Sequence, residues 1–251
     1  MMKRILALLL LLPSISFADN MMVCGDSLWG NWKDVYPRHP IHSMTAAPPT
    51  SVATGGAIVG NWDDTGQAGV LGVGALNKYI RSDARFVVVA ISYNDAAILY
   101  LHTSIAAMVT AYKNFIQDEL IDERGIAPEN IIYLTDFPKL KSTHETGSVA
   151  ACIAGGAAEC VAAGNLVLGQ FYAALKPVVL GMGCKWADHW AWVKSSYPNT
   201  DDYVHLISQD GIHAANNNAI FAHRVMDLIA AEMDMATPQK GAYCQGGAYT
   251  Q

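Results

Sequence analysis

Phe86-Val87-Val88-Val89-Ala90-Ile91 is the strongest strand signal in the chain. The run is continuous and β-branched, as expected for a central parallel strand that helices cover on both faces. A helical stripe of apolar residues follows at 105–120, with Gly125 as its C-terminal stop, and another buried strand follows at 131–134. This alternation of strand, helix and strand implies right-handed crossovers and a mostly parallel sheet.

Two further strands are expected before this unit. Met21 to Cys24 is a short apolar run that ends at a Gly-Asp-Ser turn, and residues 55–61 suit a second strand that enters a tight turn. The stretch that ends at Thr54 has no convincing periodicity and is expected to be loop. Residues 70–80 are compatible with a helix despite their glycines.

After residue 134 the pattern becomes less regular. Residues 137–164 are expected to form an insertion near the site, either a lid or a loop without function. A helix is expected over 166–175, stopped by Pro177 and followed by a last strand at 178–180. The aromatic segment 186–197 is expected to be irregular. The final helix should bury a stripe formed by Phe221, Val225, Leu228 and Ile229.

Four polar residues stand where strands or loops should open onto one edge of the sheet. Ser27 lies in the loop after the first strand, Asn94 follows the strongest strand, and Asp210 and His213 precede the final helix. A serine hydroxyl needs a base to become a nucleophile, and a histidine oriented by a carboxylate supplies one. The oxyanion of acyl transfer also needs donors, which the Ser27 N–H, a glycine N–H and the Asn94 amide can provide.

Three motifs carry a resemblance to a known family. Gly25-Asp26-Ser27-Leu28, a mid-chain Asn94-Asp95, and Asp210-Gly211-Ile212-His213 resemble the motifs of the SGNH, or GDSL, hydrolases, which are serine esterases and lipases. Their order and approximate spacing match along essentially the whole mature chain. The resemblance implies a flavodoxin-like three-layer α/β sandwich with a mostly parallel central sheet. It also implies Ser27 as the nucleophile, Asp210 and His213 as acid and base, and Asn94 as an oxyanion-hole side chain.

The match departs from the family pattern in two places. Ser92 stands where the family's third motif usually has glycine, so the turn that carries Asn94 is expected to be shaped differently. The glycine of the oxyanion hole is poorly defined: Gly60 is our choice, and Gly56 and Gly66 are rivals. The plainer interpretations are a turn serine at 27, a turn former at 94 and a helix-capping pair at 210 and 213.

The N-terminus and the charge bear on the compartment and the partners. Residues 1–18 have the basic start, the short apolar core and the small residues of a secretory signal, which leaves one hydrolase domain at 19–251 in the periplasm or outside the cell. The net charge of −6 argues against a nucleic-acid partner, and no later stretch predicts an integral membrane anchor. No metal-ligand spacing or phosphate-binding loop is apparent, so we expect no metal and no cofactor.

The five cysteines suggest some pairing in an oxidising compartment. Cys152 with Cys160 is the favoured bridge, and Cys184 with Cys244 is a second suggestion. Cys24 would then be free, buried and inert.

The predicted activity is hydrolysis of a carboxylic ester through an acyl-enzyme. The substrate would be a small-molecule, polysaccharide or lipid ester, such as a short-chain or acetyl ester of a sugar or lipid. The alternatives are acyl transfer by the same residues and a non-catalytic carbohydrate- or lipid-binding module. The tryptophans at 29, 32, 186, 190 and 192 have two interpretations. In the first they line a substrate pocket or stack on sugar, and in the second they fill the core or its rim, as tryptophans in an α/β domain more often do.

Overall fold

The chain forms a five-stranded parallel sheet between helices. The computed structural model describes residues 21–26, 50–53, 57–63, 65, 73–97, 104–138, 157–199, 202, 206–207 and 219–233. The strands, in spatial order, are β2 (Thr50–Ala53), β1 (Met21–Gly25), β3 (Phe86–Ala90), β4 (Ile131–Leu134) and β5 (Lys185–Ala187). Every neighbouring pair is parallel, which confirms the expected parallel sheet.

The strand order places a topological switch between β1 and β3. From β1 the chain passes to β2 at one edge, then returns to β3 on the other side of β1, which is the flavodoxin-like order. The register pairs Met21 with Phe86 and Gly25 with Ala90, so both strands end side by side. In open sheets of this kind, ligands bind outside the carboxyl ends of the strands at such a point.

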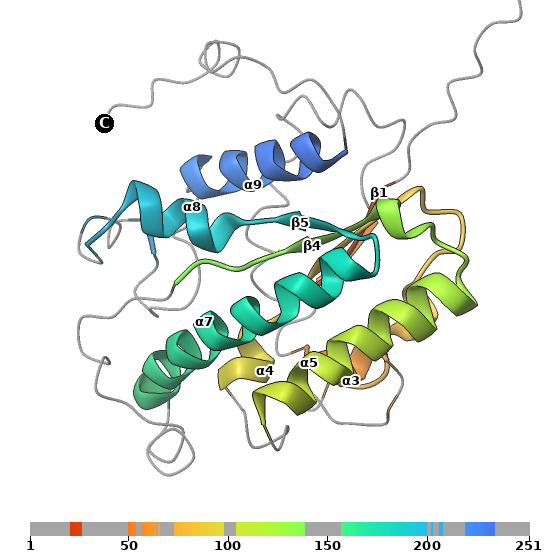
Figure 1. Ribbon diagram of the computed structural model, residues 1–251, viewed down its shortest axis with the longest axis horizontal. Coiled ribbons are helices and arrows are strands. Elements are labelled where there is room, and N and C mark those ends of the chain that lie inside the picture. The colour runs from red at the N-terminus through yellow and green to blue at the C-terminus, as the bar shows by residue number, and fades with distance from the viewer. Residues whose placement is uncertain are drawn as a thin grey trace, which may run out of the picture.

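Helices cover both faces of the sheet. Figure 1 shows α9 on one side of the strands and α5 and α7 on the other, which gives the three layers expected. The α-helices are α3 (Val59–Trp62), α4 (Tyr93–Ala97), α5 (Ile105–Asn114), α7 (Ala157–Gly181), α8 (His189–Ser196) and α9 (Ala219–Glu232). The π-helix η5 (Phe115–Glu123) continues α5, and the 3-10 helices are η3 (Asn77–Tyr79) and η6 (Pro128–Asn130).

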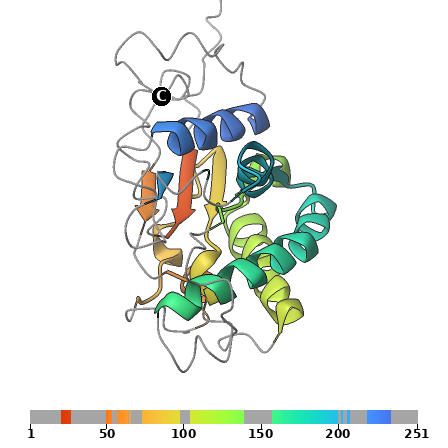
Figure 2. The same ribbon diagram turned by 90° about the vertical axis from the view of Figure 1, so that its left-hand side faces the viewer.

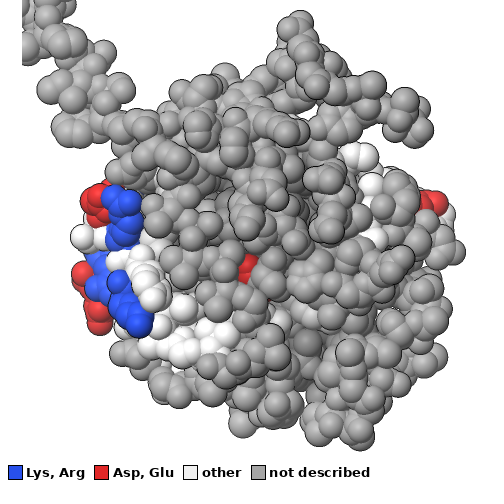
Figure 3. Space-filling view, turned by 180° about the vertical axis from the view of Figure 1, so that it is seen from behind, with Lys and Arg blue, Asp and Glu red and all other residues white. Residues whose placement is uncertain are grey.

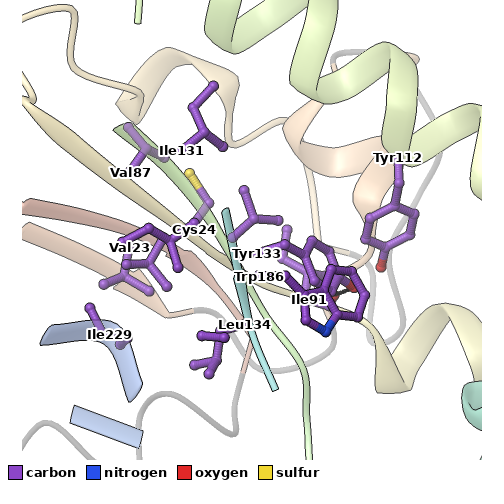
Figure 4. Close-up of a cluster of buried hydrophobic side chains, with 14 of the residues drawn as sticks. Val23, Cys24, Val87, Ile91, Tyr112, Ile131, Tyr133, Leu134, Trp186 and Ile229 are labelled. Atoms are coloured by element: carbon purple, nitrogen blue, oxygen red, sulfur yellow. Dashed lines mark hydrogen bonds between the residues drawn. The ribbon is translucent and has the colours of Figure 1, made fainter. Parts of the chain in front are cut away.

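The core lies on both faces of β1, β3 and β4. Val87, Val88 and Val89 are fully buried, which explains why the strand signal is continuous and not alternating. Figure 4 shows Val23 and Leu134 on the side of Ile229 from α9. Successive side chains of a strand point to opposite faces, and Cys24 accordingly lies on the other side of β1.

Several elements follow the sequence pattern closely. β1, β3 and β4 match the expected strands at 21–24, 86–91 and 131–134. The helix expected over 105–120 is formed by α5 and η5, and Gly125 ends it with a φ of 67°, in the left-handed region. In α9, Phe221, Val225 and Ile229 are buried as expected, and Leu228 packs against the core.

The second strand was misplaced in the sequence interpretation. Residues 59–62 form the helix α3, and the strand is β2 at Thr50–Ala53, inside the stretch expected to be loop. The Asn61 side chain accepts a hydrogen bond from the Ile58 N–H at 2.9 Å, and this cap favours a helical turn over an extended strand. Within 73–80, the described part of the possible helix at 70–80, the helical residues are those of η3.

The helix that contains Pro177 was also misread. α7 runs through Pro177 to Gly181, so no strand forms at 178–180, and the last strand is β5. A proline frees the carbonyl four residues earlier, here that of Ala173, which is exposed and can bind water. Residues 157–164 of the expected insertion belong to this helix, and 139–156 lie outside the described residues.

The segment 186–197 is regular and not irregular. It contains the end of β5 and the whole of α8. Asp188 caps this helix by accepting a hydrogen bond from the Ala191 N–H at 3.0 Å. An Asp before a helical turn is a recognisable start signal, but the density of aromatic residues obscured it.

Two cysteines have side chains that the structure describes, and both are free thiols. Cys24 is free and buried, as expected. Cys184 is also free and buried, so the suggested Cys184–Cys244 bridge is wrong. Cys152 lies outside the described residues, and the described part of the chain does not test its bridge to Cys160.

No helix among the described residues combines the length and the apolar character that crossing a bilayer would require. On the face shown in Figure 3, described Lys and Arg side chains gather at one side with Asp and Glu side chains beside them. Among the described residues, Arg81 forms an ion pair with Asp83, and Arg124 forms one with Glu123.

Candidate active site

The candidate site lies at the carboxyl ends of β1 and β3. β1 ends at Gly25, and the next residue, Asp26, is buried. Ser27 follows directly and lies outside the described residues, as do Asp210 and His213. Figure 2 shows α3 in orange and α4 in yellow next to each other, beyond the arrowheads of β1 and β3. These two helices carry Gly60 and Asn94.

Asn61 holds the turn that contains Gly60. Its side-chain oxygen caps the Ile58 N–H, its amide donates to the Val73 carbonyl at 2.8 Å, and its own carbonyl accepts from the Leu76 N–H at 2.6 Å. Gly60 is the second residue of α3, and N–H groups in the first turn of a helix have no acceptor within that helix. The Asn61 hydrogen bonds therefore fix the position of the turn that contains Gly60.

Asn94 reaches from α4 to the segment that precedes Gly60. Its side-chain nitrogen donates to the Ala57 carbonyl at 2.9 Å across 37 residues of sequence. The acceptor is a carbonyl oxygen, so the atom that faces it must be the amide nitrogen. An amide nitrogen has two hydrogens, which leaves the second one to donate elsewhere. The structure thus brings the two predicted donors onto neighbouring turns.

Asp95 makes a second link between the same turns. It is fully buried, and its Oδ2 accepts hydrogen bonds from the Val59 N–H at 3.0 Å and from the Tyr112 hydroxyl at 2.9 Å. Burial, followed by the charge of Asp95, raises the pKa of Tyr112 well above its ordinary value. Tyr112 therefore stays protonated and keeps donating to Asp95 at neutral pH.

Ser92 also has a defined partner. Its hydroxyl lies 2.6 Å from that of Tyr172 on α7, and Tyr172 accepts a hydrogen bond from the Asp136 N–H at 2.9 Å. Next to Ser92, the Ile91 carbonyl accepts from the Tyr133 hydroxyl at 3.0 Å. Ser92, which stands where the resembled motif has glycine, thus ties the end of β3 to α7 and, through Tyr172, to the loop after β4.

The buried tyrosines at 112, 133 and 172 share one electrostatic feature. Burial is the main cause that raises the pKa of Tyr133 and that of Tyr172 well above the ordinary value. The negative charge of Asp136 adds to the effect on Tyr172. All three hydroxyls, including that of Tyr112, therefore keep their protons at neutral pH.

The described tryptophans are packed within the fold. Trp186 stacks on Tyr133 with 4.9 Å between ring centroids, and Lys176 lies over the Trp186 ring. His189 stacks on Trp192, and Arg224 also lies over the Trp192 ring. Rings with these neighbours act as core or rim residues, which favours the second interpretation of the tryptophans at 186 and 192.

The sequence motifs located part of this arrangement and missed the rest. Hydrogen bonds from Asn94 to Ala57 and from Val59 to Asp95 join the turns that carry Gly60 and Asn94, while the rivals Gly56 and Gly66 lie outside the described residues. The supporting roles of Asp95, Tyr112 and Asn61 were not predicted. A carboxylate directly after Asn94 was a visible signal, but Tyr112 looked like any apolar position of a helical stripe. The described residues include no group of three or more side chains suited to a metal ion.

Comparisons with known proteins identify the fold. No protein-family model and no curated protein matches the sequence. A carbohydrate acetylesterase family member from Sinorhizobium meliloti is 14% identical over 86% of this chain and 100% of its own, with a TM-score of 0.55. An acetylxylan esterase from Geobacillus stearothermophilus, solved as a catalytic mutant, is 11% identical over 88% of this chain and 97% of its own, with a TM-score of 0.54. A GDSL-like lipase from Bacteroides thetaiotaomicron is 10% identical over 86% of each chain, with a TM-score of 0.52. The chain therefore has the fold of the SGNH, or GDSL, hydrolases.

Proposed function

We propose that this chain, with its SGNH hydrolase fold, is an exported serine esterase. Residues 19–251 would form the hydrolase domain after removal of the leader at 1–18. The substrate would be a short-chain or acetyl ester of a sugar or a lipid, and no cofactor would take part. The observation that supports this most is the hydrogen bond from Asn94 to Ala57, because it puts two predicted oxyanion donors on adjoining turns at the switch point.

The proposed mechanism begins at Ser27. His213, oriented by Asp210, removes the Ser27 proton as the hydroxyl oxygen attacks the ester carbonyl. The N–H groups of Ser27 and Gly60 and the second Asn94 amide hydrogen stabilise the oxyanion. His213 then protonates the departing alcohol, and a water molecule activated by His213 releases the acid from Ser27.

Ester kinetics test this proposal. Purified mature protein is assayed with p-nitrophenyl acetate, butyrate and octanoate, beside Ser27→Ala and Ser196→Ala. Ser196 is an exposed serine at the end of α8, so its variant controls for the loss of a hydroxyl group. We expect Ser27→Ala to abolish hydrolysis and Ser196→Ala to retain it. Equal turnover by wild type and Ser27→Ala would contradict the serine mechanism.

The same assay separates the alternatives. Transfer of the acyl group to an added alcohol, at the expense of free acid, would identify an acyltransferase that uses the same residues. Binding of a sugar or lipid ester without turnover would support the non-catalytic module. Preference for acetate over octanoate would favour a small deacetylase pocket.

A further inference from the structure

Tyr112 belongs to α5 and to none of the site motifs, yet its hydroxyl reaches the turn that carries Asn94. It donates to Asp95 Oδ2, and the same oxygen accepts the Val59 N–H. One carboxylate oxygen therefore connects three elements, α3, α4 and α5. Since Asp95 has no exposed surface, these partners replace the water that would otherwise solvate its charge.

Two neighbouring side chains fasten α4 to α3. Asn94 holds the Ala57 carbonyl, and Asp95 holds the Val59 N–H two residues further on. Gly60 follows Val59 directly, and Asn94 precedes Asp95 directly. The two bonds together thus set both the separation and the relative orientation of the Gly60 N–H and the Asn94 amide.

The tyrosine limits the freedom of the carboxylate. The Val59 N–H and the Tyr112 hydroxyl reach Asp95 Oδ2 from different elements, so together they restrict rotation about its side-chain bonds. The Tyr112 hydroxyl occupies a second direction on the same oxygen. Its ring is held in turn by Phe171, with 4.8 Å between centroids, and by Tyr133, with 6.0 Å. Figure 4 shows Tyr112 on the side of the sheet where Tyr133 and Trp186 stack.

We propose that Tyr112, acting through Asp95, is a positioning residue that sets the geometry of the oxyanion hole; this inference rests on the proposed function. Tyr112 would not touch the substrate. It would align two donors that come from different elements. A small displacement of one donor relative to the other would weaken the hydrogen bonds to the oxyanion and so reduce stabilisation of the transition state.

Tyr112→Phe tests this role, with Tyr133→Phe as the matched control. Both changes remove one fully buried hydroxyl that donates one hydrogen bond, but Tyr133 donates to the Ile91 carbonyl and to neither donor turn. Each variant is assayed with p-nitrophenyl acetate and with its thiono counterpart, in which sulfur replaces the carbonyl oxygen. Sulfur is a weak hydrogen-bond acceptor, so the thionoester gains little from an oxyanion hole.

The expected result is a selective loss. Tyr112→Phe should lower kcat on the oxygen ester about 10-fold with KM nearly unchanged, less than the ~10²-fold or greater loss caused by removing a donor outright. Its rate on the thionoester should change by less than about 2-fold. Asp95→Asn should reproduce this selective loss, and it provides a second test if Tyr112→Phe does not fold. Tyr133→Phe should stay within about 3-fold of wild type on both esters.

Three outcomes would overturn the positioning role. The first is an equal loss on both esters in Tyr112→Phe and Asp95→Asn, the second is the same kinetic pattern in Tyr133→Phe, and the third is an unaffected Tyr112→Phe beside an active wild type. Failure of the proposed function looks different, because the wild type would then hydrolyse neither ester. That result would remove the positioning role as well, whereas an active wild type with an unaffected Tyr112→Phe removes the positioning role alone.

Discussion

Replacing Ser92 by alanine tests how the turn after β3 is held. The Ser92 hydroxyl lies 2.6 Å from that of Tyr172, and both side chains are buried. Loss of one buried hydrogen bond should lower the free energy of unfolding by about 1 kcal/mol. Tyr172→Phe should cost more, roughly 2–4 kcal/mol, because it removes two buried hydrogen bonds, the one with the Ser92 hydroxyl and the one from the Asp136 N–H.

A double-mutant cycle makes this prediction quantitative. Once Tyr172 is phenylalanine, the Ser92 hydroxyl has already lost its bond to Tyr172, so adding Ser92→Ala should cost less than it does in the wild type. The coupling free energy should be about 1 kcal/mol, measured by urea unfolding followed by circular dichroism. Additivity within ~0.3–0.5 kcal/mol would refute the reasoning, since it would mean that the two hydroxyls do not interact.

Three further predictions concern stability and reactivity. The pKa values of Tyr112, Tyr133 and Tyr172 are raised by burial, so their contribution to stability is complete below the unfolded-state pKa of about 10 and declines as pH rises toward the folded-state values. The urea midpoint should therefore fall as pH rises from 9 to 11, and an unchanged midpoint would contradict this. Burial raises the pKa of Cys184 to about 12 and that of Cys24 further, so iodoacetamide at pH 8 should modify neither thiol until the protein unfolds, as peptide mapping would report. Gly125→Ala should cost about 1 kcal/mol through its φ of 67°, whereas the matched change Gly74→Ala should be nearly neutral, because an added Cβ meets nothing within 4 Å at either position. Equal unfolding free energies for these two variants would argue against backbone strain at Gly125.

The sequence predicted the elements whose apolar pattern is long and self-consistent. β3 is buried on both faces and therefore reads as an unbroken run, and α5 with η5 repeats its apolar residues at helical spacing. These two elements imply the parallel sheet, and the motif positions imply which edge carries the site. The proximity of Gly60 and Asn94 follows from the same logic.

The errors come from contacts that a local pattern does not contain. The short apolar run before Gly60 suits a strand or a helix equally, and the Asn61 cap decides in favour of the helix. Pro177 normally ends a helix, but the carbonyl that it frees lies on an exposed side of α7. Asp95 and Tyr112 meet across 17 residues and act on Val59, 36 residues away from Asp95, so their role becomes visible only in three dimensions.

The most direct test of the central claim is the site of covalent attack. Mature protein that hydrolyses p-nitrophenyl acetate is treated with a fluorophosphonate, digested and analysed by mass spectrometry. We predict one phosphonylated residue, Ser27, and a loss of esterase activity in proportion to its labelling. Full inactivation with the label on another residue, or full activity after complete labelling of Ser27, would contradict a serine esterase site at the carboxyl end of β1.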